Sequence, residues 1–201
     1  MLMQADESQL VLVDFQARLK PAMLDAEAVW ANAARLATLA KAMQLPIWGT
    51  EQNPSRLGEM PPEIRSHCRQ VLAKMHFSAV EEGLGEWLKP ETPQAPRGNA
   101  RSLPRHLQKT QPAAQERQTI VLGGCEAHVC LLQTALDLLE DEFEVWVVTD
   151  ACSSRTERNR DAAYDRLAGA GAELVTAEMV AFEWVRSAEH PEFKLLQTLF
   201  K

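Results

Sequence analysis

Short apolar runs alternate along the chain with longer stretches in which apolar residues recur at helical spacing. Continuous apolar runs predict strands that are buried on both faces of a sheet. These runs cover 10–13, 45–50, 70–73, 119–122, 144–149 and 173–176. Apolar residues at intervals of three and four predict helices over 23–43, 78–87 and 156–170, another beginning near 127, and two more from about 177 onward.

This alternation of strands and helices predicts the fold class. Parallel strands joined by helices form right-handed crossovers, which place helices on both faces of the sheet. We therefore expect an α/β protein, a three-layer α/β/α sandwich with about six parallel strands.

Length and charge narrow the class of partner. The chain has 201 residues, with 21 Lys and Arg against 28 Asp and Glu, giving a net charge of -7. This balance disfavours nucleic acid and anionic membranes as partners. No apolar run approaches the ~20 residues that cross a bilayer. The first residues lack the pattern of a secretion signal, so we expect a cytoplasmic protein.

One segment departs from the alternation. Residues 90–118 carry five of the 11 prolines, more basic than acidic residues and little apolar periodicity. We expect a single domain over 1–201 with an exposed, Pro-rich, basic insertion at 90–118. A solvated loop is the simpler interpretation, and a contact surface for a partner is the alternative.

The cysteines suggest thiol chemistry rather than crosslinking or metal binding. Without a secretion signal, reduced thiols are expected, and the paired C-x-x-C spacing of structural zinc sites is absent. We predict neither a metal nor a cofactor. The four residues are Cys68, Cys125, Cys130 and Cys152.

Three reactive side chains follow predicted strands. Asp14 ends the first strand, Lys74 ends the third, and Cys130 follows the fourth at the start of a helix. Ligands bind at the carboxyl ends of parallel strands, so these groups are expected to meet there. A helix N-terminus and a nearby ammonium would lower the pKa of Cys130 below ~8.5. Cys130 would then be a nucleophile and Asp14 a proton carrier, which predicts acyl transfer through a thioester.

The segments around these residues resemble a known family. They read LVLVDFQ at 10–16, KMHFS at 74–78 and GCEAHVC at 124–130. The chain resembles the isochorismatase-like cysteine hydrolases, and in particular their metal-independent branch, over nearly its whole length outside the insertion. The resemblance implies a Rossmann-like sandwich, a catalytic triad of Asp14, Lys74 and Cys130, and a homo-oligomer, a dimer or larger.

The resemblance also implies details of the site. It implies a cis peptide at Cys125–Glu126 and an oxyanion hole formed by the backbone N–H groups of Glu126 and Cys130. Residues 50–58 contain no histidine, which disfavours the metal-dependent nicotinamidases, and the retained Cys130 disfavours isochorismate cleavage. A C–N bond in a small amide, carbamoyl or imide compound remains as the expected target.

Further residues near the strand ends are candidates for the substrate pocket. Trp48 and Phe77 fit the core equally well. His128 stands two residues before Cys130, a spacing that faces the two apart on a helix, so we expect it in the pocket wall or at the helix start. The full set is Gln16, Trp48, Glu51, Phe77 and His128.

A second hypothesis belongs to another functional class. The chain could be a catalytically idle interaction protein that uses the 90–118 segment for contact. The three filled triad positions favour the hydrolase. A nucleotide-binding oxidoreductase is disfavoured because no G-x-G-x-x-G follows the first strand. Apolar residues from 177 onward exceed the needs of an edge element, so we expect them to help bury a subunit interface. They are Phe182, Trp184, Val185, Phe193, Leu195, Leu196 and Phe200.

Overall fold

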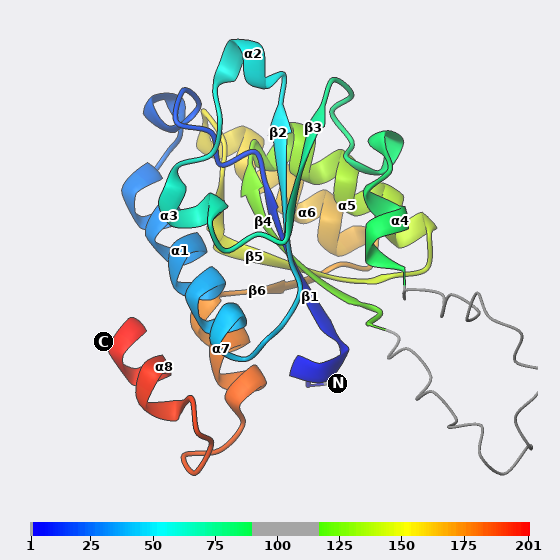
Figure 1. Ribbon diagram of the computed structural model, residues 1–201. Coiled ribbons are helices and arrows are strands. Elements are labelled where there is room, and N and C mark those ends of the chain that lie inside the picture. The colour runs from blue at the N-terminus through cyan, green and yellow to red at the C-terminus, as the bar shows by residue number, and fades with distance from the viewer. Residues whose placement is uncertain (1, 90–116) are drawn as a thin grey trace, which may run out of the picture.

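The computed structural model describes residues 2–89 and 117–201, and its centre is one parallel sheet (Figure 1). The six strands lie in the order β3-β2-β1-β4-β5-β6. The predicted six-stranded α/β fold is therefore confirmed. The strands are β1 (Ser8–Val13), β2 (Ile47–Gln52), β3 (Gln70–Lys74), β4 (Thr119–Cys125), β5 (Glu144–Ser153) and β6 (Glu173–Val175).

Helices cover both faces of this sheet and complete three layers (Figure 1). One face carries α1 (Ala26–Ala42), α3 (Pro62–Arg65), α7 (Ala177–Val185) and α8 (Phe193–Leu199). The other carries α4 (Leu84–Leu88), α5 (Leu132–Glu140) and α6 (Glu157–Gly169). A short helix, α2 (Pro54–Leu57), follows β2.

Two predicted helices differ locally from expectation. The stretch expected as one helix over 78–87 is a 3-10 turn, Val80–Glu82, followed by α4, because Gly83 between them takes a left-handed φ of 95°. The helix expected from 127 begins with a π-helical turn, Ala127–Leu131, before α5. A π-helical turn of this kind is frequent at functional sites.

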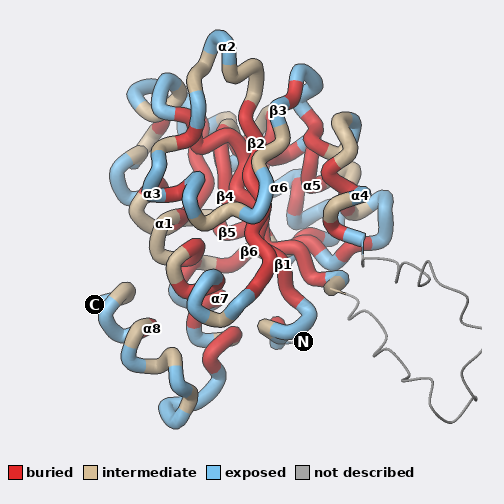
Figure 2. Tube along the Cα trace, in the orientation of Figure 1, coloured by how far each residue is buried: buried red, intermediate tan, exposed pale blue. Residues whose placement is uncertain are grey.

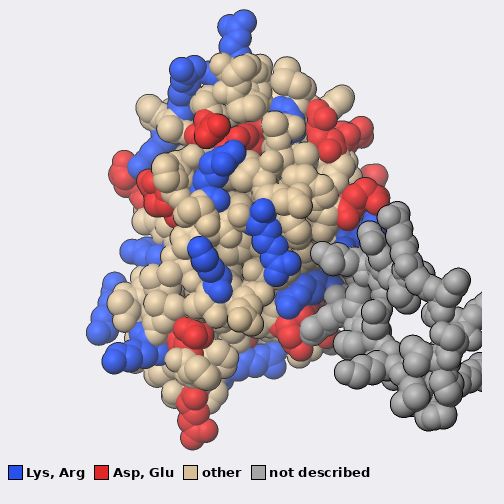
Figure 3. Space-filling model, in the orientation of Figure 1, with Lys and Arg blue, Asp and Glu red and all other residues tan. Residues whose placement is uncertain are grey.

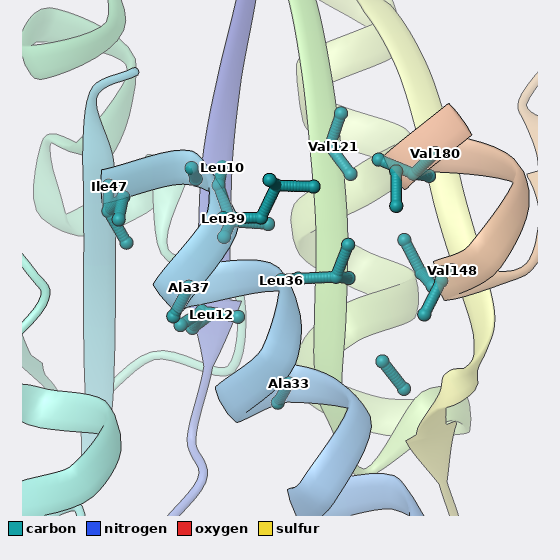
Figure 4. Packing of buried hydrophobic residues seen from close by; sticks show 14 of the residues in the cluster. Leu10, Leu12, Ala33, Leu36, Ala37, Leu39, Ile47, Val121, Val148 and Val180 are labelled. Atoms are coloured by element: carbon teal, nitrogen blue, oxygen red, sulfur yellow. The ribbon is translucent and has the colours of Figure 1, made fainter. Parts of the chain in front are cut away.

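Each strand near the centre contributes to two cores. Leu10 and Leu12 of β1 pack against α1, whereas Val11 and Val13 pack against the opposite helices. Every residue of β1 is buried (Figure 2), which explains its continuous apolar sequence. Figure 4 shows Leu36 and Leu39 of α1 and Val121 of β4 meeting over the sheet.

The order of the strands reverses between β1 and β4, which are hydrogen-bonded neighbours. Val13 is paired with Gly124, so the carboxyl ends of the two strands lie level. A Cβ on Gly124 would come within 2.6 Å of the Val13 Cβ, and its φ of 157° is also unfavourable for other residues. Glycine is thus required for this close approach.

The residues on either side of 90–116 meet at the opposite end of β1. Residues 90–116 themselves, which make up most of the expected insertion, lie outside the described residues. Gln9 Nε2 donates to the carbonyl of Leu88 at 2.8 Å and to that of Arg117 at 3.0 Å. The two boundaries therefore meet at one buried side chain. None of the helices in the described ranges has the length and apolar character needed to cross a membrane.

Candidate active site

Asp14 lies directly after β1, at the point where the strand order reverses. It is fully buried and adopts a left-handed φ of 52°. Thr50 Oγ1 donates a hydrogen bond to its Oδ1 at 2.6 Å. Its Oδ2 lies 2.9 Å from Lys74 Nζ, but this geometry leaves Oδ2 without an aligned hydrogen bond from any described residue. One oxygen of the carboxylate is thus fixed by Thr50, and the other faces the Lys74 ammonium.

Lys74 is the last residue of β3, and its ammonium group is as inaccessible to water as the carboxylate it faces. Its Nζ donates to Gln52 Oε1 at 2.7 Å and to two carbonyls, those of His76 at 3.3 Å and Phe77 at 2.9 Å. These acceptors, with Asp14, replace the water that a buried ammonium loses. The loop after β3 thus fixes the position of the charge.

Cys130 lies in the π-helical turn after β4 and is nearly buried. Its Sγ is 3.8 Å from Gln52 Oε1. Burial and the negative charge of Asp14 raise the pKa of the Cys130 thiol to about 12, and Lys74 offsets only part of this. The expected lowering of this pKa is therefore wrong, because the ammonium is paired with a carboxylate and the site is shielded from water.

The peptide bond Cys125–Glu126 is cis. The Glu126 carboxylate accepts hydrogen bonds from the backbone N and the Nε of Arg155, at 3.2 and 2.8 Å. His128 follows in the same turn, with Nδ1 2.9 Å from Ser154 Oγ and Nε2 3.3 Å from Asn159 Nδ2. Both ring nitrogens are thus engaged by residues after β5, which fits a role at the helix start.

The other proposed pocket residues have structural roles. Gln16 accepts a hydrogen bond from the backbone N of Gln52 and donates one to its carbonyl. Glu51 accepts from Met60 N at 2.8 Å and from Arg65 Nε at 3.2 Å, and so anchors the chain after β2. Trp48 lies within the core instead of at the strand ends.

The position of Trp48 is explained by its partners. Its Nε1 donates to Gln9 Oε1 at 2.9 Å, and its ring packs against Trp87 with centroids 5.8 Å apart. Trp48 pairs with Val11 in the middle of β1, whereas the candidate site lies beyond the end of that strand. Trp48 is therefore part of the packing beneath α4 rather than of the pocket.

Phe77 lies next to the triad, since its carbonyl accepts a hydrogen bond from Lys74 Nζ. Its side chain is 51% exposed, and that of Met75 is 64% exposed. Both border a hollow of about 730 Å³ that is also lined by Gln133 of α5, whereas the three triad residues do not line it. A hollow of this size fits a small molecule. Among the described residues, no group of His, Cys, Asp and Glu is arranged to hold a metal ion.

Two residues at the site were not identified from the sequence: Thr50, which fixes Asp14, and Gln52, which contacts both Lys74 and Cys130. Side chains alternate along a strand, so 50 and 52 share one face of β2 while Glu51 points to the other. If the predicted strand had been extended two residues, to 52, the alternation of its side chains would have indicated both Thr50 and Gln52.

Comparison with known proteins gives consistent matches. The sequence profile of the isochorismatase domain matches residues 103–179. Isochorismatase domain-containing protein 2A of Mus musculus is 33% identical over 98% of this chain and 84% of its own length. Isochorismatase domain-containing protein 2 of Homo sapiens is 32% identical over 96% of this chain and 83% of its own.

Solved structures agree with the sequence matches. The MAR1 ribonuclease from Caenorhabditis elegans superimposes with a TM-score of 0.82 at 28% identity, over 99% of this chain and 92% of that one. The YcaC gene product from Escherichia coli, described as an octameric hydrolase of unknown specificity, gives 0.80 at 25% identity, over 100% and 89%. The chain therefore belongs to the isochorismatase domain family, the isochorismatase-like hydrolases.

Proposed function

We propose that the protein is a cysteine hydrolase that cleaves a C–N bond of a small amide, carbamoyl or imide compound through a thioester on Cys130. The observation that carries this proposal is the buried pair of Asp14 and Lys74, 2.9 Å apart, beside the thiol of Cys130. A nucleophile, a proton acceptor and a group that orients the acceptor form the arrangement that covalent hydrolysis requires.

Because the pKa of Cys130 is about 12, the residue is a thiol at neutral pH and needs a base during attack. Asp14 is the proposed base, since its carboxylate lies within hydrogen-bonding reach of the Cys130 thiol. Thr50 fixes the other carboxylate oxygen, and Lys74 stabilises the negative charge until the proton arrives.

The proposed steps conserve atoms and protons. The Cys130 sulfur bonds to the substrate carbonyl carbon while its proton passes to Asp14. Asp14 then gives that proton to the leaving nitrogen, the C–N bond breaks, and a thioester and free amine or ammonia result. Water next gives a proton to Asp14 and attacks the thioester. The C–S bond breaks, and Asp14 returns the proton to the sulfur.

The backbone N–H groups of Glu126 and Cys130 are proposed to stabilise the oxygen that becomes negative during attack. The hydrogen bond from Arg155 Nε to the Glu126 carboxylate supports a fixed backbone at this point. Phe77 and His128 are proposed as pocket walls, with the hollow at Met75 and Phe77 as the approach for substrate.

The test is a screen of small amides, carbamoyl compounds and cyclic imides for release of ammonia or amine. Cys130→Ala is expected to lower turnover at least about a thousandfold, because the nucleophile acts with the other triad members as a unit. Cys68→Ala, which removes a thiol just before β3, at the opposite end of that strand from Lys74, is the control and is expected to keep its activity. Full turnover by Cys130→Ala would disprove the thioester mechanism.

A homo-oligomer is proposed as the assembly, since the similar YcaC gene product is described as octameric. The C-terminal helices contribute less to this surface than expected: Trp184, Val185 and Leu196 pack into the protein's own core. Phe182, with Met179, is exposed on α7 and is the better candidate. Light scattering of Phe182→Glu should show a smaller assembly than the unaltered protein, and an unchanged mass would exclude this contact.

Nucleic acid is not proposed as a substrate, although a structural neighbour is described as a ribonuclease. The chain carries a net charge of -7, and the face in Figure 3 mixes Lys and Arg with Asp and Glu. Such a surface offers little attraction for phosphates. Incubation with single-stranded RNA tests the point: cleavage that disappears in Cys130→Ala would overturn it.

A further inference from the structure

Gln52, at the end of β2, lies between two groups of the candidate triad. Its Oε1 accepts a hydrogen bond from Lys74 Nζ at 2.7 Å and lies 3.8 Å from the Sγ of Cys130. A single amide oxygen therefore contacts both the ammonium and the thiol. This oxygen has no role in the proposed reaction steps.

The orientation of the Gln52 side chain is fixed. Its Nε2 donates to the carbonyl of Met75 at 2.8 Å, so the amide cannot turn its nitrogen toward Lys74 without losing that bond. Met75 is held in turn, since its backbone N donates to Glu82 Oε1 at 2.9 Å. The backbone of Gln52 is bonded to Gln16 through both its N–H and its carbonyl.

The direction of the amide dipole has an electrostatic consequence. The oxygen is its negative end, so it attracts the Lys74 ammonium and can accept the S–H of Cys130, but it disfavours a thiolate at that sulfur. The ammonium also directs hydrogens to the carbonyls of His76 and Phe77. Lys74 is thereby held next to Asp14, while the thiol of Cys130 also lies within its reach.

We propose that Gln52 is a positioning residue that keeps Lys74 beside Asp14 and adds to the bias against a thiolate at Cys130 before substrate enters. This inference rests on the proposed cysteine mechanism. With Gln52 in this role, Cys130 retains its thiol proton, which Asp14 can then pass to the leaving nitrogen. A free thiolate would have lost that proton to solvent before the substrate bound.

Two substitutions of Gln52 separate this role from simple packing. Gln52→Met keeps the length of the side chain but removes the oxygen that competes with the sulfur for the Lys74 ammonium, so the pKa of Cys130 should fall. Gln52→Glu keeps an oxygen acceptor for Lys74 and adds negative charge, so that pKa should not fall. Loosening of the site alone would change both variants in the same direction. Gln197→Met, on the exposed side of α8, is the matched control.

The readout is the rate at which iodoacetamide labels Cys130 at pH 8, located by mass spectrometry. A lower pKa raises the rate about threefold per unit, because a tenfold gain in thiolate is partly offset by weaker nucleophilicity. We expect faster labelling in Gln52→Met, no acceleration in Gln52→Glu and no change in Gln197→Met. Equal rates in Gln52→Met and the unaltered protein, or equal acceleration in both Gln52 variants, would overturn the inference.

A direct titration keeps the result independent of reagent access. The ultraviolet absorbance of the thiolate, measured against Cys130→Ala in each background, gives the ionisation of this sulfur alone. An unchanged titration in a folded Gln52→Met protein also overturns the inference. Failure of the proposed function gives a different result: Cys130→Ala would retain hydrolysis, whatever the labelling rates of the Gln52 variants.

Discussion

Asp14 and Lys74 are opposite charges that have both lost contact with water. Such a pair is tolerated only when other polar groups replace the lost hydration. Here Thr50 serves the carboxylate, while Gln52 and two loop carbonyls serve the ammonium. The pair is better explained by chemistry than by stability, since apolar residues of similar volume often stabilise a protein at least as well.

Removing one charge of this pair should destabilise the protein more than removing both. Lys74→Met leaves the Asp14 carboxylate buried without its partner, at an expected cost of about 3–5 kcal/mol in the free energy of unfolding. The double variant Asp14→Asn/Lys74→Met should recover part of that loss. Urea unfolding of both single variants and the double variant measures the coupling. A strictly additive double variant would show that the two charges do not interact.

At this same scale, the sequence predicts which residues lie at the strand ends better than it predicts what their side chains do. Asp14, Lys74 and Cys130 meet because parallel strands place their carboxyl ends together. The pKa of Cys130 had the wrong expected sign because burial is a property of the packed molecule. Gln52 was missed because β2 runs to residue 52, two residues beyond its predicted end.

At the scale of elements, the contact between β1 and β4 depends on the absence of a side chain at Gly124. Gly124→Ala is expected to destabilise the protein by about 3 kcal/mol or more, since overpacking adds to an unfavourable φ. Thermal unfolding is the measurement. Gly169→Ala in α6, where a Cβ meets nothing within 4 Å, is the control and should be neutral or slightly stabilising. Similar losses in both variants would contradict the proposed close approach.

The loop after β3 depends on one carboxylate. Glu82 accepts hydrogen bonds from the backbone N–H groups of Met75 and His76 and contacts the His76 ring, which lowers the pKa of Glu82 to about 2. The unfolded chain would titrate near the ordinary value of 4.5. The stabilisation is thus present above pH 4.5 and is lost as the pH falls toward 2.

Glu82→Gln should therefore lower stability at neutral pH and flatten its dependence on pH in this acidic range. Urea unfolding at several pH values between 2 and 7 tests this, with Glu189→Gln, an exposed carboxylate in the stretch before α8, as the control. An acid profile identical to that of the unaltered protein would show that Glu82 does not hold the loop.

Element boundaries were less predictable than element types. The apolar runs identified all six strands, most clearly β1 and β4, which are buried on both faces and have no polar side to interrupt the run. The break at Gly83 and the π-helical turn before α5 depend on a single backbone conformation and on packing against the neighbouring elements. Periodicity does not encode either feature.

At the scale of the whole molecule, the parallel arrangement separates two ends with different roles. Asp14, Lys74 and Cys130 gather at the carboxyl end of the sheet, where loops from strands far apart in sequence converge. The fold class followed from strand and helix alternation alone, while the assembly of these loops required the strand order, which the alternation does not specify.

The other end of the sheet offers a place to alter the chain. Gln9 holds Leu88 and Arg117 at one point, and the five residue steps from Gln9 to Asp14 put that point about 16 Å from the candidate site. Because both boundaries are already held together, we expect that a short linker between Leu88 and Arg117 would leave the sheet folded. We therefore expect a sensor or an affinity module joined at these two boundaries to lie remote from the candidate site.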